Sequence, residues 1–348
     1  IIDEEHEQSY KSENSPRYHA RETALYRAQM ENARLVLGSA TPSLEAYTKA
    51  KDGEFRLVKL DARFEDRPLP KVSVIDLREE LREGNRSVLS RSLRKAIENR
   101  LECGEQAILF LNRRGYAGFV SCRSCGAVLK CPHCDVALTE HNNGRLVCHY
   151  CGYEQPRVEK CPVCGSPYIG GFKAVTQQIE QVLHKNFPKA RILRMDYDTT
   201  RAKGSYEKIL SSFAAHEADI LVGTQMIVKG HDFPDVTLVG ALAADLSLNV
   251  ADYRCAERTF QLLTQAVGRS GRGMKPGEAI IQSYHPDHYS IQAAAAQDYE
   301  AFYQEEMAYR MLMDYPPAAH MLSVLVSGEN EELVEQGMDY LAKFVERI

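Results

Sequence analysis

Short apolar runs alternate with stretches of helical period along this chain. The runs, rich in Val, Ile and Leu, cover residues 35–37, 107–111, 192–193, 220–222 and 236–242. Between several of them, apolar residues recur at helical spacing and predict helices over residues 92–103, 176–186, 206–215 and 256–266. Strands and helices in alternation predict an α/β fold with parallel sheets covered by helices on both faces. Ligands of such sheets bind at the carboxyl ends of the strands, so the chemistry is expected there.

Two segments interrupt this pattern. Residues 61–90 are charged, contain two prolines and lack a helical period, which favours a linker. A cysteine-rich block at residues 121–171 then interrupts the second stretch of α/β pattern. We therefore expect one α/β unit over residues 1–60 and a second over residues 91–300 that carries the cysteine-rich block as an insertion.

Both ends of the chain have distinct patterns. After residue 300 a Tyr-, Met- and Glu-rich helix candidate reaches Asp314, two prolines stop it, and a strand-like run follows at residues 322–326. We expect residues 301–348 to begin a further domain. Ile1 and Ile2 have the character of the cut end of a buried strand, so we expect a fragment whose preceding part matters.

Composition restricts the class of protein. The formal net charge is -5 and the isoelectric point is near 6.2, so any contact with nucleic acid is expected to be local. An 18-residue apolar run and a charged leader with a cleavage site are both absent, which gives no support for a membrane span or a secretory signal. We expect a cytoplasmic protein.

Eight of the ten cysteines form four Cys-x-x-Cys pairs between residues 122 and 164. In a reducing compartment such pairs favour metal over disulfides, and four pairs supply two tetrahedral zinc sites. Thirteen residues, including Asn142-Asn143-Gly144, separate the second and third pairs and favour a ribbon hairpin between them. The predicted arrangement is nested: one site has Cys122, Cys125, Cys161 and Cys164, and the other has Cys131, Cys134, Cys148 and Cys151. Sequential pairing is the alternative. The remaining cysteines, Cys103 and Cys255, are expected to be packed apolar side chains.

Two polar segments follow apolar runs near the start of the chain. Asp3-Glu4-Glu5-His6 puts acids at a strand end, where one can hold magnesium and the next can orient water; the alternative is a charged surface turn. Gly38-Ser39-Ala40-Thr41-Pro42-Ser43 is either a loop that senses phosphate or couples two lobes, or an ordinary turn with an N-cap.

Two further segments lie near the far end of the second α/β unit. A strand delivers Thr224, and a Gly-x-Asp turn follows at residues 230–232. Gln265, Arg269 and Arg272 are spaced i, i+4, i+7, which predicts an amide and two guanidiniums on one helical face. Such a pair of arginines can clamp a phosphoryl group, while Gly268 and Gly271 permit a close approach; the alternative is a solvated basic face.

Taken in order, these segments resemble motifs II, III, V and VI of superfamily 2 helicases. With four Cys pairs between the third and fifth motifs, the chain closely resembles the PriA family of bacterial replication-restart helicases. The resemblance implies RecA-like lobes, a partial first and a complete second, with a double zinc-binding insertion and the start of a C-terminal domain. It also implies 3′ to 5′ movement powered by ATP with Mg2+, two structural Zn2+ ions, and a monomer. The implied partners are forked and single-stranded DNA, primosome proteins and single-stranded DNA-binding protein.

The resemblance also assigns roles to residues. Asp3 is expected to help hold magnesium, Glu4 to activate water, and His6 to couple the lobes. Ser39 and Thr41 are expected to link hydrolysis to DNA grip, and Thr224 to touch the DNA backbone. The residues expected around the nucleotide are Asp3, Glu4, Gly230, Asp232, Gln265, Arg269 and Arg272. An aromatic-rich loop with Tyr10, Tyr18, His19 and Arg21 matches one that contacts unpaired bases in this family, and packing against the lobe is the alternative.

Two departures from the family pattern are visible. Where the family has a Gly-x-Gly-Thr turn, this chain has Lys173-Ala174-Val175-Thr176, which puts the close approach of that loop to DNA or nucleotide in doubt. No Gly-x-x-x-x-Gly-Lys-[Ser/Thr] phosphate loop occurs in the 348 residues, so the fragment alone is not expected to hydrolyse ATP well. A zinc-dependent DNA- and protein-docking module with the lobes as scaffold is the alternative function. A restriction or remodelling motor is a third reading.

Overall fold

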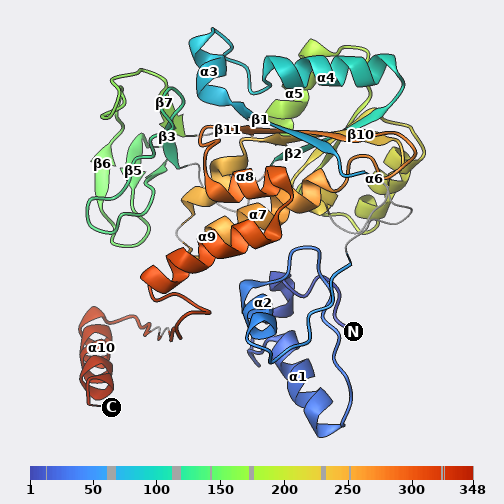
Figure 1. Ribbon diagram of the computed structural model, residues 1–348. Helices are drawn as coiled ribbons and strands as arrows, with labels where there is room; N and C mark the ends of the chain where they lie inside the picture. Colours follow the sequence, from blue (N-terminus) through green and yellow to red (C-terminus); the bar gives the residue numbers. More distant parts are fainter. Residues whose placement is uncertain are drawn as a thin grey trace. The chain divides into compact units, whose positions relative to one another are not determined.

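The computed structural model describes the chain except for residues 13, 61–67, 112–118, 142, 172–175, 229–232, 251, 323, 325 and 348. It divides into two compact units, Ile1–Glu306 and Met307–Ile348. Figure 1 shows their elements, and each unit is described by itself.

The larger unit contains a six-stranded parallel sheet, as the alternating pattern predicted. Its strands lie in the order β1-β11-β10-β2-β9-β8, and every adjacent pair is parallel. The strands span, in that order, Lys71–Asp76, Glu278–Ser283, Val236–Leu242, Gln106–Leu111, Ile220–Gly223 and Ile192–Met195. The polar residues that follow these strands therefore meet at one edge of the sheet.

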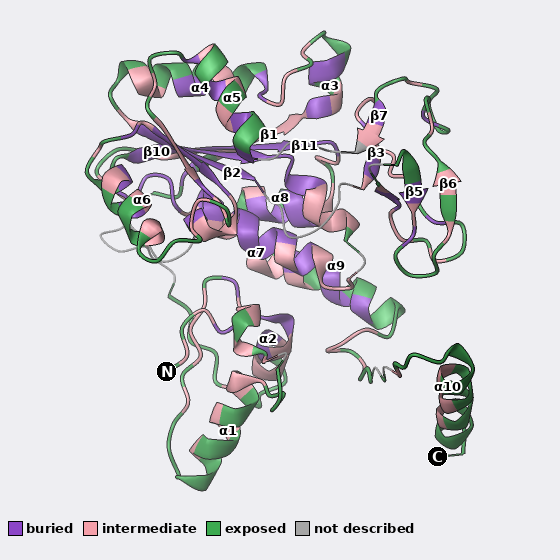
Figure 2. Cartoon of the chain, turned by 180° about the vertical axis from the view of Figure 1, so that it is seen from behind, coloured by how far each residue is buried: buried purple, intermediate pink, exposed green. Residues whose placement is uncertain are grey.

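Helices cover both faces of this sheet (Figure 1). On one face lie α4 (Arg91–Glu102) and α5 (Thr176–Asn186); on the other lie α6 (Ser205–Ala214), α7 (Cys255–Val267) and α8 (Tyr289–Ala296). The four inner strands, β11, β10, β2 and β9, are buried almost throughout (Figure 2), because a parallel sheet between two helical layers has no wet face. The edge strands β1 and β8 are mostly half-buried.

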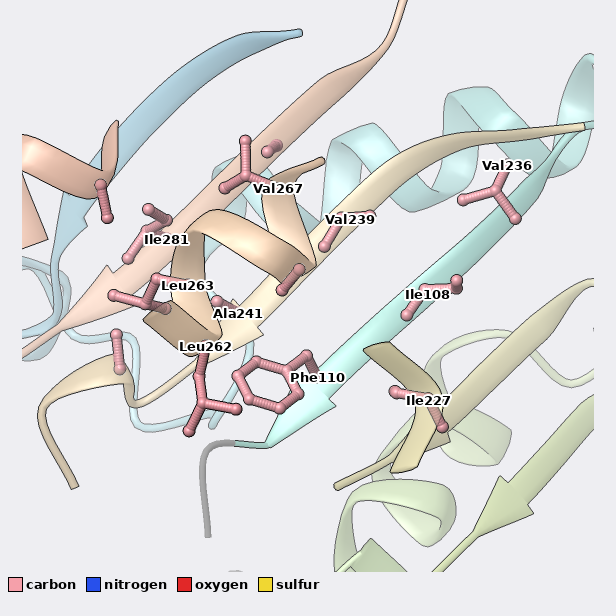
Figure 3. Close-up of a cluster of buried hydrophobic side chains, with 14 of the residues drawn as sticks. Ile108, Phe110, Ile227, Val236, Val239, Ala241, Leu262, Leu263, Val267 and Ile281 are labelled. Carbon is pink, nitrogen blue, oxygen red and sulfur yellow. The ribbon is translucent and has the colours of Figure 1, made fainter. Parts of the chain in front are cut away.

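Strand β2 shows how one run serves two cores. Ala107, Leu109 and Leu111 pack in one core with α4 and α5. Ile108 and Phe110 point the other way and pack near residues of α7, including Leu262 (Figure 3). Side chains of a strand alternate between faces, so one apolar run fills both cores.

The expected linker over residues 61–90 is wrong for part of its length. Residues 71–76 form edge strand β1, which pairs in parallel with β11, and helix α3 (Leu77–Arg82) follows. Val72 and Val74 pack against the core from this edge. The nearby prolines and charges hid a short alternating strand, which is stabilised by a partner about 200 positions later in the chain. Residues 61–67 of the linker lie outside the described residues.

The first sixty residues form a smaller set of elements. Ile2 and Leu37 make one isolated parallel bridge, so the buried strands expected at these two apolar runs are wrong beyond this pair. Ile1 is 95% exposed and Val36 is 53% exposed. One 3-10 turn and two helices follow the chain: η1 (Gln8–Tyr10), α1 (Ala20–Met30) and α2 (Leu44–Lys51). Leu44 is fully buried in the core that contains α7, so α2 is packed against the second α/β unit.

The cysteine-rich block forms a small antiparallel insertion. Strands β3 (Val120–Cys122) and β7 (Ile169–Gly171) close its base, and β4 (Thr139–Glu140), β5 (Arg145–Val147) and β6 (Glu154–Pro156) form a three-stranded sheet. The β4–β5 hairpin confirms the predicted ribbon.

The C-terminal part contains α9 (Tyr299–Leu312) and α10 (Glu331–Val345). The expected strand at 322–326 is wrong for its described residues, 322, 324 and 326, which have no strand pairing. Among all described residues, no helix is both long and apolar enough to cross a bilayer.

Candidate functional site

Asp3 and Glu4 lie directly after the bridge between Ile2 and Leu37, as the sequence predicted. The amide of Ile2 donates to the Val36 carbonyl at 2.8 Å, and the amide of Gly38 donates to the Ile2 carbonyl at 2.8 Å. Glu4 has a φ of 47°, a region that costs a residue with a side chain about 1 to 2 kcal/mol. Such strain is concentrated at functional positions, and here it turns the chain sharply after the strand.

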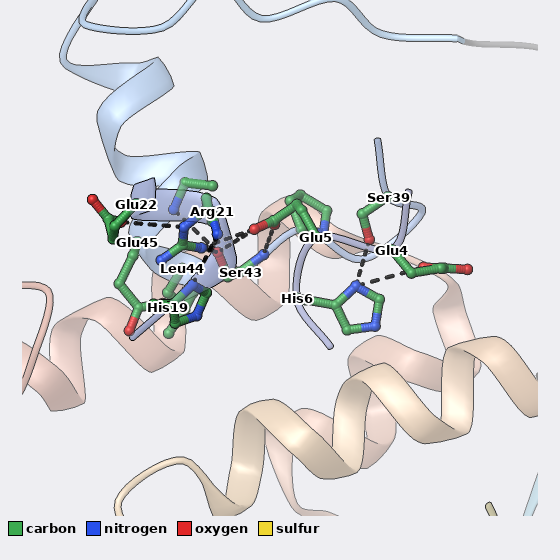
Figure 4. Close-up of polar contacts among 12 residues, drawn as sticks. Glu4, Glu5, His6, His19, Arg21, Glu22, Ser39, Ser43, Leu44 and Glu45 are labelled. Atoms are coloured by element: carbon green, nitrogen blue, oxygen red, sulfur yellow. Dashed lines mark hydrogen bonds and ion pairs between the residues drawn. The ribbon is translucent and has the colours of Figure 1, made fainter. Parts of the chain in front are cut away.

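His6 connects three segments that are far apart in the sequence. Its Nδ1 lies 2.7 Å from Ser39 Oγ and 3.5 Å from Glu4 Oε2 (Figure 4). Its Nε2 lies 2.9 Å from Gln265 Nε2. Since an amide nitrogen only donates, Nε2 accepts, and the proton of a neutral ring is on Nδ1, which donates to Ser39. Ser39 Oγ also accepts from the Thr41 amide at 3.0 Å.

Helix α7 ends at Val267, so the expectation that Gln265, Arg269 and Arg272 share one helical face is wrong. Gly268 is the C-cap, and the chain turns after it. The Nε of Arg272 donates back to the Gly268 carbonyl at 2.9 Å. Arg269 is 9% exposed. Burial raises the pKa of Tyr206, and the positive charge of Arg269 opposes this rise. A glycine after a helical pattern is a common signal for the end of a helix, and Gly268 marks the end of α7 although the i, i+4, i+7 spacing continues to Arg272.

The close approach expected at Gly271 is confirmed within this chain. Gly271 has a φ of 67°, and a Cβ there would lie 2.4 Å from the Gly277 amide nitrogen. Its own amide donates to the Val236 carbonyl at 3.0 Å. The glycine therefore fits the turn after α7 tightly against the beginning of β10 and the segment before β11.

The DNA contacts expected near Tyr10 remain predictions, but the structure gives two of these residues other contacts. Tyr10 donates from its hydroxyl to the Asp3 carbonyl at 2.8 Å. Arg21 Nη1 donates to Glu5 Oε2 at 2.8 Å and to Ser43 Oγ at 2.6 Å, and its side chain is 11% exposed. Arg21 is thus held within the lobe (Figure 4).

The other predicted side chains lie as follows. Tyr18 is 53% exposed, and His19 caps α1 by accepting from the Arg21 amide. Burial, with the nearby Arg21 charge, lowers the pKa of His19. Thr41 is fully buried, and Thr224 lies between the end of β9 at Gly223 and the start of η3 (Gln225–Val228). Gly230, Asp232 and the Lys173-Ala174-Val175 departure lie outside the described residues.

Sequence reasoning missed two carboxylates at the start of α2. Glu5 Oε1 accepts from the Ser43 amide at 2.6 Å, and Glu257 Oε1 accepts from the Leu44 amide at 3.0 Å. Both are buried, at 2% and 4% exposure. Carboxylates are favourable at a helix N-terminus because unpaired amides and the helix dipole attract negative charge. Glu257 comes from α7, and nothing in its local sequence distinguishes it from a surface glutamate.

A cluster of tyrosines joins α2 to the beginning of α9. Tyr47 donates to Glu300 at 2.6 Å and packs edge-on against Tyr299 and Tyr303, with ring centroids 4.8 and 4.9 Å away. Tyr299 donates to the Pro42 carbonyl at 2.8 Å. Burial raises the pKa of Tyr299 well above its ordinary value, so the hydroxyl remains a donor at neutral pH. This second contact between distant segments was also invisible in the sequence.

The eight paired cysteines gather into two groups of four, and the nested arrangement is confirmed. One group holds Cys122, Cys125, Cys161 and Cys164; the other holds Cys131, Cys134, Cys148 and Cys151. Sulfur atoms from different pairs lie 3.6 to 3.7 Å apart. Four thiolates around zinc at 2.3 Å are separated by about 3.8 Å, so both groups fit a structural zinc ion with no open coordination position.

Of the remaining cysteines, Cys103 was expected to be packed, and this is wrong, because its side chain is exposed at the C-cap of α4. Cys255 is half-buried.

Comparison with known proteins gives family matches to the cysteine-rich block and to part of the second α/β unit. Residues 131–156 match the PriA DNA helicase Cys-rich region (CRR) domain, and residues 170–274 match the helicase conserved C-terminal domain. Curated relatives named replication restart protein PriA include one from Bacillus subtilis, 53% identical over 346 residues, covering 99% of this chain and 43% of the relative. One from Synechocystis is 46% identical over 358 residues, covering 100% of this chain and 43% of the relative. One from Haemophilus influenzae is 37% identical, covering 99% and 47%. The chain spans less than half the length of these relatives.

Proposed function

Because the chain belongs to the PriA family of replication restart proteins, we propose that it is part of an ATP-dependent DNA helicase that acts in replication restart. The chain covers 43% of its Bacillus relative, so the activity is assigned to the whole protein. Forked and single-stranded DNA are its proposed substrates. Primosome proteins, single-stranded DNA-binding protein, a monomeric state and a cytoplasmic location are proposed from the family resemblance.

The contact that carries this proposal is the one between His6 and Gln265. It joins the acidic segment after the first strand to the end of α7, 259 positions later, while the other ring nitrogen contacts Ser39. A motor must transmit the state of a nucleotide to the segments that grip its track. A ring whose two nitrogens contact different segments responds to both, because movement of either partner breaks one of its hydrogen bonds.

The residues around Asp3 fit a magnesium nucleotide. Asp3 and Glu4 offer oxygen ligands of the kind Mg2+ prefers, and among the described residues Glu4 Oε2 is buried without a hydrogen-bond donor. Bound Mg2+ supplies charge neutralisation for the phosphates of ATP. Asp3 is proposed to hold it and Glu4 to orient water. Arg269 and Arg272 are proposed to face the γ-phosphate, beside Gln265 and the 230–232 turn.

The remaining predicted residues serve DNA in this proposal. Ser39 and Thr41 are proposed to couple hydrolysis to grip, and Thr224 to contact the DNA backbone. Tyr10, Tyr18, His19 and Arg21 are proposed to form a loop at unpaired bases. The zinc-bearing insertion is proposed to build a docking surface, because a closed site with four thiolates has no position for catalysis.

The test uses the full-length protein with Arg269→Ala or Arg272→Ala. Removing a guanidinium that stabilises a transferring phosphoryl group is expected to lower DNA-stimulated ATP hydrolysis by at least about 100-fold. DNA affinity should change less than threefold. Arg191→Ala is the matched control, since Arg191 is an exposed surface arginine paired with Asp219.

Turnover equal to that of the parent in both variants would refute the phosphate-clamp role. If the parent itself binds forked DNA but hydrolyses no ATP, the alternative of a zinc-dependent docking module replaces the motor.

A further inference from the structure

Two histidines lie against each other on the exposed edge of the three-stranded ribbon. His141 directly follows β4, and His149 lies in the turn between Cys148 and Cys151. Both side chains are exposed, and their Nε2 atoms are 3.3 Å apart. Neither belongs to the two groups of thiols.

The backbone sets this separation. The His141 amide donates to the Arg145 carbonyl at 2.9 Å, and the Gly144 amide donates to the His141 carbonyl at 3.0 Å, so the hairpin turn holds His141. The amide of Gly152 donates to the Cys148 carbonyl at 3.0 Å, which closes the turn that carries His149. The two residues are therefore carried side by side by a hairpin and by a zinc-binding turn, so a ligand would have to order only their side chains.

The separation fits a shared metal ion. Two nitrogens bound tetrahedrally at 2.0 to 2.1 Å are about 3.3 Å apart, and the imidazole nitrogens show this value. The thiol groups nearby show the same agreement, with sulfurs 3.6 to 3.7 Å apart against about 3.8 Å for zinc. The same distance also allows a direct N–H···N hydrogen bond between the two rings, and metal analysis distinguishes the two.

We propose that His141 and His149 form a third metal site, for an exchangeable divalent transition-metal ion such as Zn2+, Ni2+ or Cu2+. Imidazole nitrogen suits these ions and does not suit Mg2+ or Ca2+. With two protein ligands the site keeps open positions for water, and it binds its ion more weakly than four thiolates do. A bound ion would tie the β4–β5 turn to the Cys148–Cys151 turn and stiffen this exposed edge.

The experiment uses the untagged, zinc-loaded chain, dialysed against Ni2+ and then analysed for both metals. The expected result is about one nickel per chain beyond two retained zinc ions, with at least tenfold weaker nickel binding in His141→Ala and in His149→Ala. The control is His184→Ala, which removes an exposed histidine from α5 and should bind nickel like the parent. With Cu2+ in place of nickel, electron paramagnetic resonance should show two imidazole nitrogens in the parent and one in each variant.

Two results would overturn the site: a parent that binds no nickel beside its two zinc ions, or a His141→Ala variant that binds nickel as the parent does. Should His149→Ala lose zinc because its turn is disturbed, His141→Ala decides alone, since His141 lies outside that turn.

Discussion

Removing the carboxylate of Glu257 is expected to loosen helix α2 specifically. Its Oε1 accepts from the Leu44 amide at 3.0 Å, and both residues are buried. Alanine at position 257 leaves that amide without this acceptor in a place where little water can replace it, whereas glutamine keeps a neutral acceptor. Figure 4 shows that the start of α2 lies near the Glu5 and His6 segment. Glu257 reaches the same helix start from α7, so the change tests how α2 is joined to α7.

The size of the effect follows from the kind of bond. A hydrogen bond to a charged acceptor contributes about 1.5 to 3 kcal/mol, and leaving a buried donor unpaired costs a similar amount. We expect Glu257→Ala to lower the local free energy of opening of α2 by about 2 to 3 kcal/mol, and Glu257→Gln by about 1 kcal/mol. These values correspond to about 30- to 150-fold and about fivefold faster amide exchange.

Hydrogen–deuterium exchange of the zinc-loaded chain measures this, followed on a peptide that spans residues 43–51. Glu45→Ala is the control, because Glu45 pairs with Arg254 at the surface, with side chains 22% and 33% exposed. A surface pair contributes about 0 to 1 kcal/mol, so its loss should accelerate exchange by no more than about fivefold. Exchange in Glu257→Ala within threefold of the parent, or no faster than in Glu45→Ala, would refute the reasoning.

Two further predictions concern stability. Burial lowers the pKa of His288 to about 4 from 6.5, and its Nδ1 accepts from the Ser290 amide. As the pH falls, the imidazole of His288 is protonated in the unfolded chain before it is protonated in the folded chain, so stability is lost from pH 6.5 toward pH 4. Between about pH 7.5 and 5, the free energy of unfolding measured in urea should fall by about 2 kcal/mol more in the parent than in His288→Asn. Equal losses would contradict this. Gly271→Ala should lower the free energy of unfolding by more than about 3 kcal/mol, because its φ is 67° and the new Cβ would meet the Gly277 backbone. Gly53 has a φ of 83° but open space around it, so Gly53→Ala should lower the same quantity by only about 1 to 2 kcal/mol. Equal costs at the two glycines would show that the close approach does not matter.

The local pattern determined those elements whose stabilising contacts repeat along the chain. Strand β10 and helix α5 begin and end where their apolar patterns begin and end. The nested cysteine groups were also predictable, because a two-residue spacing fixes which thiols share a turn and loop length restricts which turns can meet. In both cases the physical preference acts over a few residues and leaves a periodic mark in the sequence.

Tertiary structure decided the features that depend on a partner far along the chain. The edge strand β1 exists because β11 lies beside it, and the polar pattern around its prolines favoured a linker. The turn after α7 separates Arg272 from the face of Gln265, since Gly271 must fit against Gly277. Glu257 became a helix cap only when folding brought Leu44 to it. A hydrogen bond across 213 positions leaves no periodic trace, because its energy depends on where two backbones meet and not on the neighbours of either residue.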